Sequence, residues 1–113
     1  MAKSLNFNNV KKQYLTVTLP DEKNTTLLIG TPTKRLMDDL MLIQSNLETL
    51  EENTDNNEAF DELYTACAKI MSRNKVGVVI TKEKLEDIFD FEDVMIFFNA
   101  YMEFIDEVTR SKN

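Results

Sequence analysis

The feature that most constrains the fold of this chain is an apolar stripe near its end. With about 100° between successive residues of a helix, one side carries Val94, Phe97, Phe98, Tyr101, Phe104, Ile105 and Val108. Met95 and Met102 widen the stripe to roughly half of the circumference, whereas a surface helix needs only about 100° to cover one core. Six of the ten aromatic residues lie between Phe89 and Phe104. The sequence therefore predicts a long final helix with more apolar surface than one core requires.

The composition predicts a single folded domain over residues 1–113. Apolar residues make up 42% and charged residues 29% of the chain, which is typical of a globular domain. Only 2 glycines and 2 prolines are present, so a fold made of many tight turns is disfavoured. We expect a mainly helical domain of ordinary size.

The first 30 residues predict an arm and a β-hairpin. Residues 1–12 are rich in asparagine and form the predicted N-terminal arm, with Leu5, Phe7 and Val10 as possible anchors. Residues 14–19 alternate in period 2 with β-branched and aromatic side chains, residues 20–24 suit a turn, and residues 25–30 resume an extended pattern. Residues 13–30 are therefore predicted to form the hairpin.

The helical part is predicted over residues 32–109. Its first helix has Thr31 as N-cap and Pro32 at the first position, and continues to about residue 51 or 52. This helix carries a heptad-like seam of Leu36, Leu40, Ile43, Leu47 and Leu50. A second helix is predicted over about residues 58–73, and residues 74–80 form a connector that could hold one extended segment. A third helix is predicted over residues 82–89 after a Thr81 cap. The final helix is predicted to start at Asp90, which has the spacing of a capping box with Asp93. The predicted fold class is mainly α (α+β): an N-terminal β-hairpin followed by a bundle of about four α-helices.

The residues required for common catalytic chemistry are missing from the sequence. The chain has no histidine, so the usual general base and the usual triads are absent. Cys67 lies in a helical pattern between Ala66 and Ala68, where a buried apolar role is the simplest interpretation. Gly30 and Gly77 are isolated, so no glycine-rich phosphate loop exists. We therefore expect no enzyme, no catalytic residues, no cofactor and no metal site; the acidic residues near 83–93 are explained by helix starts and a solvated face.

The charge of the chain bears on its partners. The formal net charge is −7 and the sequence pI is about 4.6, so phosphate backbones and anionic lipids should repel it. We expect no nucleic-acid and no membrane partner. No apolar signal segment and no run of ~20 apolar residues is present, which predicts a cytoplasmic location.

Five residues are candidates for contact with another protein. Met37 and Met41 lie beside the leucine seam, and methionine suits adaptable binding surfaces. Ile96 points away from the main stripe of the final helix. Phe97 and Tyr101 lie in the stripe, where a core role is the simplest interpretation and a contact role the alternative.

Two parts of the chain together resemble a known protein family. One runs from Leu5-Asn6-Phe7 to Lys12-Gln13-Tyr14-Leu15-Thr16-Val17-Thr18-Leu19-Pro20-Asp21, and the other from Phe89-Asp90-Phe91-Glu92-Asp93 through Phe97-Phe98-Asn99-Ala100-Tyr101 to Ile105. They resemble the small tail assembly chaperones of long-tailed phages and prophages of Gram-positive bacteria. The resemblance implies a helical, non-enzymatic protein of the bacterial host cytoplasm that is absent from the mature virion. It also implies binding to the tape-measure protein and the major tail protein, and possible self-association.

Two other functions fit the same residues. The first is a small acidic interaction or regulatory module that masks a basic partner. The second is a structural virion protein, for example a head–tail connector.

Overall fold

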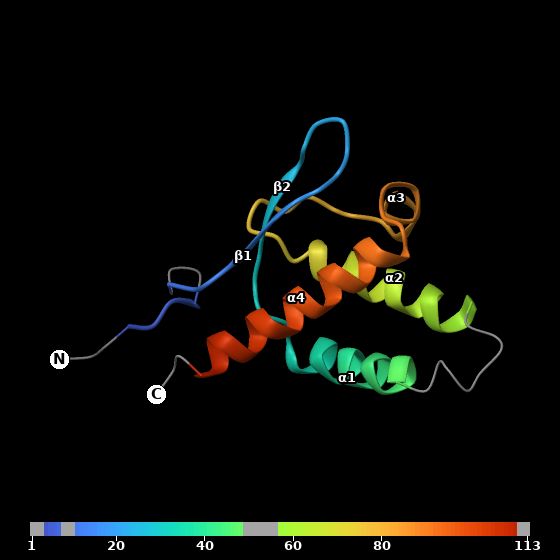
Figure 1. Ribbon diagram of the computed structural model, residues 1–113. Coiled ribbons are helices and arrows are strands. Elements are labelled where there is room, and N and C mark those ends of the chain that lie inside the picture. Colours follow the sequence, from blue (N-terminus) through green and yellow to red (C-terminus); the bar gives the residue numbers. More distant parts are fainter. Residues whose placement is uncertain (1–3, 8–10, 49–56, 111–113) are drawn as a thin grey trace.

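Two strands precede four helices in the described residues of the computed structural model, which are 4–7, 11–48 and 57–110 (Figure 1). The strands are β1 (Leu15–Thr18) and β2 (Thr26–Ile29), and the helices are α1 (Lys34–Glu48), α2 (Asn57–Met71), α3 (Lys82–Ile88) and α4 (Phe91–Arg110). The predicted fold class, a β-hairpin followed by a mainly helical part, is confirmed. Helix α2 contacts α1, α3, α4 and β2, so it is the element around which the others pack.

The hairpin is antiparallel, and its turn is held by one carboxylate. Leu15 pairs with Ile29 and Thr18 with Thr26. The Asp21 carboxylate accepts hydrogen bonds from the Thr25 backbone N–H at 2.9 Å and from the Thr25 hydroxyl at 2.7 Å. These bonds, and the Lys84 ammonium 3.2 Å away, lower the pKa of Asp21 to about 2. The ion pair also links the turn to α3.

The connector after α2 covers the outer edge of β2. The Lys75 N–H donates to the Leu28 carbonyl at 2.9 Å, and the Gly30 N–H donates to the Arg73 carbonyl at 3.3 Å. Only Asn74 forms a β-bridge there, with Ile29. The sequence predicted that residues 74–80 could hold one extended segment; in the structure, Asn74 alone of these residues pairs with a strand.

The start of α1 differs from the prediction. Its cap is Thr33, whose hydroxyl accepts the Leu36 N–H at 3.2 Å, and not Thr31. The reason is tertiary: the Thr31 carbonyl accepts a hydrogen bond from Arg73 Nε at 3.2 Å, which keeps the chain beside the α2 connector for two more residues. The predicted helix end at 51 or 52, and Leu50 of the seam, lie outside the described residues.

The starts of α3 and α4 agree with the prediction. The Thr81 hydroxyl accepts the Lys84 N–H at 3.1 Å. At α4, the Asp90 carboxylate accepts the Asp93 N–H at 2.8 Å, and the Asp93 carboxylate accepts the Asp90 N–H at 3.1 Å. This reciprocal pair is a capping box made with aspartate in place of glutamate.

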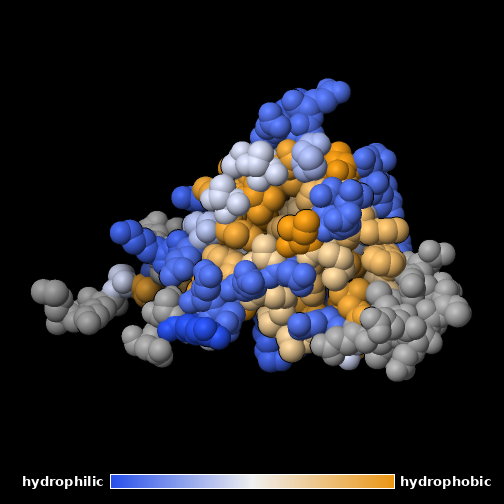
Figure 2. Space-filling model, in the orientation of Figure 1, coloured by the Kyte–Doolittle hydropathy of each residue, from blue (hydrophilic) through white to orange (hydrophobic). Residues whose placement is uncertain are grey.

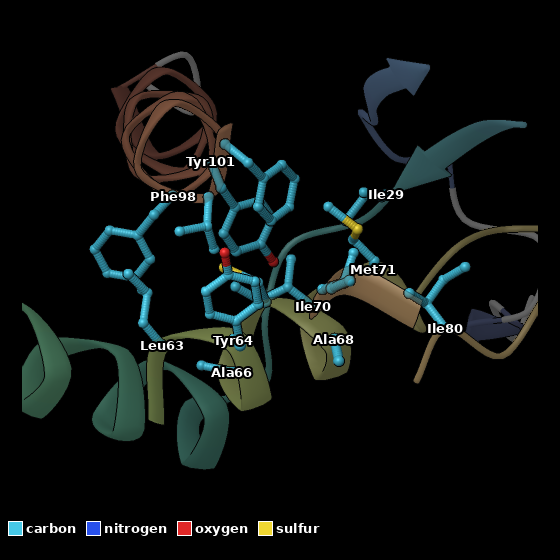
Figure 3. Packing of buried hydrophobic residues seen from close by; sticks show 14 of the residues in the cluster. Ile29, Leu63, Tyr64, Ala66, Ala68, Ile70, Met71, Ile80, Phe98 and Tyr101 are labelled. Atoms are coloured by element: carbon cyan, nitrogen blue, oxygen red, sulfur yellow. The ribbon is translucent and has the colours of Figure 1, made fainter. Parts of the chain in front are cut away.

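The core lies between α2, α4 and β2 (Figure 3). Phe98 and Tyr101 extend from α4 toward α2, and Ile29 of β2 lies near Met71. Tyr64 of α2 is buried, and its hydroxyl donates to the Phe89 carbonyl at 2.8 Å. The predicted apolar stripe of α4 is therefore largely core: its buried members are Val94, Phe97, Phe98, Tyr101 and Phe104.

Candidate protein-interaction surface

Ile96 is the most exposed large apolar residue of α4. Its side chain is 64% exposed, and Phe91, five residues earlier, is 59% exposed. Ile96 points away from the buried stripe, whereas Phe91 lies in line with Val94 and is exposed as the first residue of the helix. In the orientation of Figure 2, apolar atoms spread across the middle of the molecule, between hydrophilic groups above and below. Such exposed apolar surface is a marker of binding sites.

One side of Ile96 borders a groove made by three helices, which we call the Phe91 groove. Its volume is about 430 Å³, and it is lined by Leu47, Phe60, Phe91, Glu92, Met95, Ile96 and Asn99. The rings of Phe60 and Phe91 stack with centroids 4.4 Å apart and an angle of 24° between their planes. Tyr64 meets Phe91 edge-on at 6.4 Å. These ring contacts fix the orientation of an exposed aromatic side chain, which reduces the entropy that it would lose on binding.

The other side of Ile96 borders a groove between α4 and the hairpin, which we call the β1 groove. Its volume is about 350 Å³. All four residues of β1 line it, together with Pro20, Phe89, Asp93, Ile96, Phe97 and Ala100. The α4 members are spaced three and four apart, so they form one stripe along the helix. Ile96 is thus a ridge between two grooves.

Acidic side chains surround the Phe91 groove. Glu92 lines it, and Asp61 and Glu86 line an adjoining hollow with Phe60 and Phe91. Lys82 forms ion pairs with Asp61 and with Glu86. The hydrogen bond to Asp61 raises the pKa of Lys82. The apolar groove is therefore bordered by acidic side chains, two of which are paired with Lys82.

A second exposed apolar area lies on α1. Met41 is 51% and Leu42 is 63% exposed. Leu42 lines an open groove between α1 and α2, of about 280 Å³. Three acids, Asp39, Asp61 and Glu62, line this groove together with one base, Lys69. This groove offers apolar contact within an acidic setting.

The five predicted contact residues fall into two groups. Ile96 and Met41 are exposed, as a contact role requires, and they lie on different helices. Met37 is half-buried and packs against the core. Phe97 is 5% exposed and Tyr101 is fully buried. Phe97 and Tyr101 thus have the core role that was the simplest interpretation of the sequence, and Phe97 also lines the β1 groove with its small exposed part.

Tyr101 also has a structural partner. Its hydroxyl donates a hydrogen bond to the Gly30 carbonyl at 2.8 Å, which joins α4 to the end of the hairpin. Burial raises the pKa of Tyr101 to about 12. The polar end of this side chain is thus used inside the protein.

Two exposed residues at the grooves were not among the predicted candidates. Leu42 follows Met41 and lies two residues after Leu40 of the seam, so helical spacing alone could have placed it on another side. Phe91 is different, because it precedes Val94 by three residues and Phe98 by seven, which is the spacing of the buried stripe. It is exposed because it follows the cap residue Asp90 directly and is the first residue of α4, which spacing does not reveal.

An exposed valine loop was also missed. Val76 is 75% and Val79 is 76% exposed. Buried Asn74 holds the loop: its amide group donates to the Met71 and Val78 carbonyls, and its side-chain oxygen accepts the N–H groups of Gly77 and Val78. Four hydrogen bonds on one side chain are a tertiary arrangement that no local sequence pattern predicts.

Cys67 lies in the interior of α2, and its side chain is fully buried. Burial raises the pKa of its thiol to about 12, so the reactive thiolate is disfavoured at neutral pH. No group of three or more metal-binding side chains was found in the part of the chain that the structure describes. In the same part, no helix is both long and apolar enough to cross a membrane.

Comparisons with protein-family models, with curated proteins and with solved structures find no match to this chain.

Proposed function

We propose that this chain is a non-enzymatic tail assembly chaperone of a long-tailed phage or prophage. In this role it binds the tape-measure protein in the host cytoplasm, keeps it soluble, and promotes assembly of the tail tube from the major tail protein. The resemblance of residues 5–21 and 89–105 supports the proposal. The mainly helical fold agrees with what that resemblance implies.

The observation that carries the proposal is the Phe91 groove. A helical client binds by placing apolar side chains, spaced three and four residues apart, into an apolar groove. The groove offers Leu47 from α1, Phe60 from α2, and Phe91, Met95 and Ile96 from α4. The stacked pair of Phe60 and Phe91 supplies a rigid aromatic wall, and Met95 supplies an adaptable one. Such a surface can accept several segments of a long helical client.

The test is co-expression with the tape-measure protein whose gene, on this proposal, should lie beside the gene of this chain. The wild-type chain should raise the soluble fraction of the tape-measure protein. Ile96→Asp should remove most of this effect, because it places a charge on the ridge that borders the groove. Ser45→Asp is the matched control: it adds the same charge to an exposed position of α1 that lines none of the grooves.

Two results would count against the proposal. The first is a tape-measure protein that is equally insoluble with and without the wild-type chain. The second is equal activity of Ile96→Asp and Ser45→Asp, which would remove the ridge from the binding surface.

The acidic groove between α1 and α2 favours one alternative, a module that masks a basic partner through Asp39, Asp61 and Glu62. Binding by charge should weaken steeply when the salt concentration rises, because exposed charges are screened beyond about 10 Å at 0.1 M salt. Apolar binding at the Phe91 groove should change little. Mass spectrometry of purified virions separates the other alternative, since a structural virion protein would be found in the particles.

A further inference from the structure

The two edges of the hairpin differ in their hydrogen bonding. The outer edge of β2 is covered, because Leu28 and Gly30 bond to the backbone of Lys75 and Arg73. Among the described residues, no segment pairs with the outer edge of β1. A strand edge of this kind is a template for another strand.

The register identifies which backbone groups of β1 point outward. The Leu19 N–H donates to the Thr25 carbonyl at 2.8 Å, so these two residues form a hydrogen-bonded pair. Pairs two residues further along, Val17 with Leu27 and Leu15 with Ile29, have the same geometry. The N–H and C=O groups of Thr16 and Thr18 therefore point away from β2.

The outward edge of β1 borders the β1 groove. The stripe of Ile96, Phe97 and Ala100 on α4 forms the opposite wall. A strand added to β1 would bond to the backbone of Thr16 and Thr18 and place alternate side chains against that stripe. The groove thus requires an extended segment with apolar side chains two residues apart.

The N-terminal arm of the chain has this pattern. Leu5 is 72% and Phe7 is 70% exposed, and a polar residue lies on either side of Leu5. Residues 4–7 contain no proline, so each carries a backbone N–H. The backbone of Phe7 is in a 3₁₀ conformation and has to become extended when the arm binds as a strand. Figure 1 shows this part of the arm extending away from the strands and helices of its own molecule. Two large apolar side chains of the arm are thus exposed.

We propose that the arm of one copy, centred on Leu5 and Phe7, binds as an added strand in the β1 groove of a second copy. Four residues of extended chain span about 13 Å, which matches the four residues of β1. Leu5 and Phe7 enter the groove beside α4, and the backbone of Asn6 lies against the outer edge of β1. This contact between two copies does not involve the proposed client, because it uses the β1 groove and not the Phe91 groove.

The test uses two full-length variants with different defects. Leu5→Ser with Phe7→Ser removes the apolar residues of the arm and leaves the groove intact. Thr16→Pro removes an outward N–H from the edge and leaves the arm intact. Sedimentation equilibrium should show concentration-dependent association of the wild type, and a dissociation constant at least about tenfold weaker for each variant alone.

Mixing the two variants gives the decisive result. An intact arm is then available from one variant and an intact groove from the other, so the mixture should form 1:1 heterodimers that neither variant forms with itself. A mixture that stays monomeric overturns the proposal, as does an arm variant that associates as tightly as the wild type. A monomeric wild type, from micromolar to millimolar concentration, overturns it as well.

Hydrogen exchange supplies a second measurement if Thr16→Pro fails to fold. In the wild type, the amide protons of Thr16 and Thr18 should become protected as the concentration rises. In the arm variant, whose substitutions lie at exposed positions, they should exchange at the rate of the monomer. Equal protection in both proteins would exclude the arm as the added strand. Solubilisation of the tape-measure protein by the arm variant separates this inference from the proposed function.

Discussion

Helix α4 contains the same kinds of apolar residue in opposite environments. Val94, Phe98 and Tyr101 are fully buried, whereas Phe91 at the start of the helix and Ile96 on another side are more than half exposed. The difference is one of position and not of hydrophobicity, because phenylalanine and branched aliphatic residues occur in both environments. A buried phenylalanine stabilises this fold, whereas an exposed one is available to a partner. Four predictions test this division, from the largest effect on stability to the smallest.

The buried side should show the largest loss. Tyr101→Ala should lower the free energy of unfolding by about 3–5 kcal/mol, because it leaves a cavity and removes the hydrogen bond to Gly30. Urea unfolding followed by circular dichroism measures the loss. Tyr101→Phe keeps the ring and should lose only about 1 kcal/mol. Equal losses for the two variants would show that the hydrogen bond, and not the packing, holds this side.

The same residue predicts an alkaline effect. The pKa of Tyr101 in the folded protein is about 12, against an ordinary value of 10.0. Because the folded-state pKa is raised, the neutral phenol contributes stability that is complete below about pH 10 and is lost as the pH rises toward about 12. The urea midpoint of the wild type should therefore fall more steeply between about pH 10 and about pH 12 than that of Tyr101→Phe. If the urea midpoints of the two proteins fall in parallel as the pH rises, Tyr101 is not the source of the alkaline loss of stability.

The start of α4 should show an intermediate effect. Asp90→Ala removes the acceptor for the Asp93 N–H and should cost about 1 kcal/mol in urea unfolding. Asp90→Asn keeps an acceptor oxygen and should cost less than about 0.5 kcal/mol. A loss as large as that of Tyr101→Ala would mean that the cap, and not the buried stripe, is the main source of stability in α4.

The exposed side should show the smallest loss of stability and the largest loss of binding. Ile96→Asp should change the free energy of unfolding by no more than about 0.5 kcal/mol, because the side chain is 64% exposed. The measurements are urea unfolding and the co-expression assay with the tape-measure protein. If Ile96→Asp unfolds as easily as Tyr101→Ala, Ile96 supports the fold; if it changes neither stability nor binding, the exposed side has no role in contact.

Local sequence patterns predicted the elements with strong local causes. The hairpin follows from the alternation in residues 14–19, the turn residues 20–24 and the extended pattern of residues 25–30. The capping box of Asp90 and Asp93 follows from two acids at the spacing of a helix cap. The first helix was predicted to begin two residues too early, because Arg73 of a distant segment bonds to the Thr31 carbonyl. The sequence around Thr31 does not predict a contact with a residue so far away in the chain.

The candidate surface was predicted in part. Ile96 and Met41 were identified because each falls outside an apolar stripe, which is a property of spacing alone. Phe97 and Tyr101 could not be assigned from spacing, since a wide stripe can meet either a core or a partner. Their burial required knowledge of how α4 packs: Phe97 and Tyr101 lie 5% and 0% exposed once α2 and the hairpin are in place.

The amino-acid sequence by itself determined the order of the elements, the caps of α3 and α4, and the excess of apolar residues in α4, because these depend on local hydrogen bonding and on helical periodicity. The tertiary structure decided which of those apolar residues are core. It also created the two grooves beside Ile96 and left one edge of the hairpin open, because each of these features is made by segments far apart in the chain.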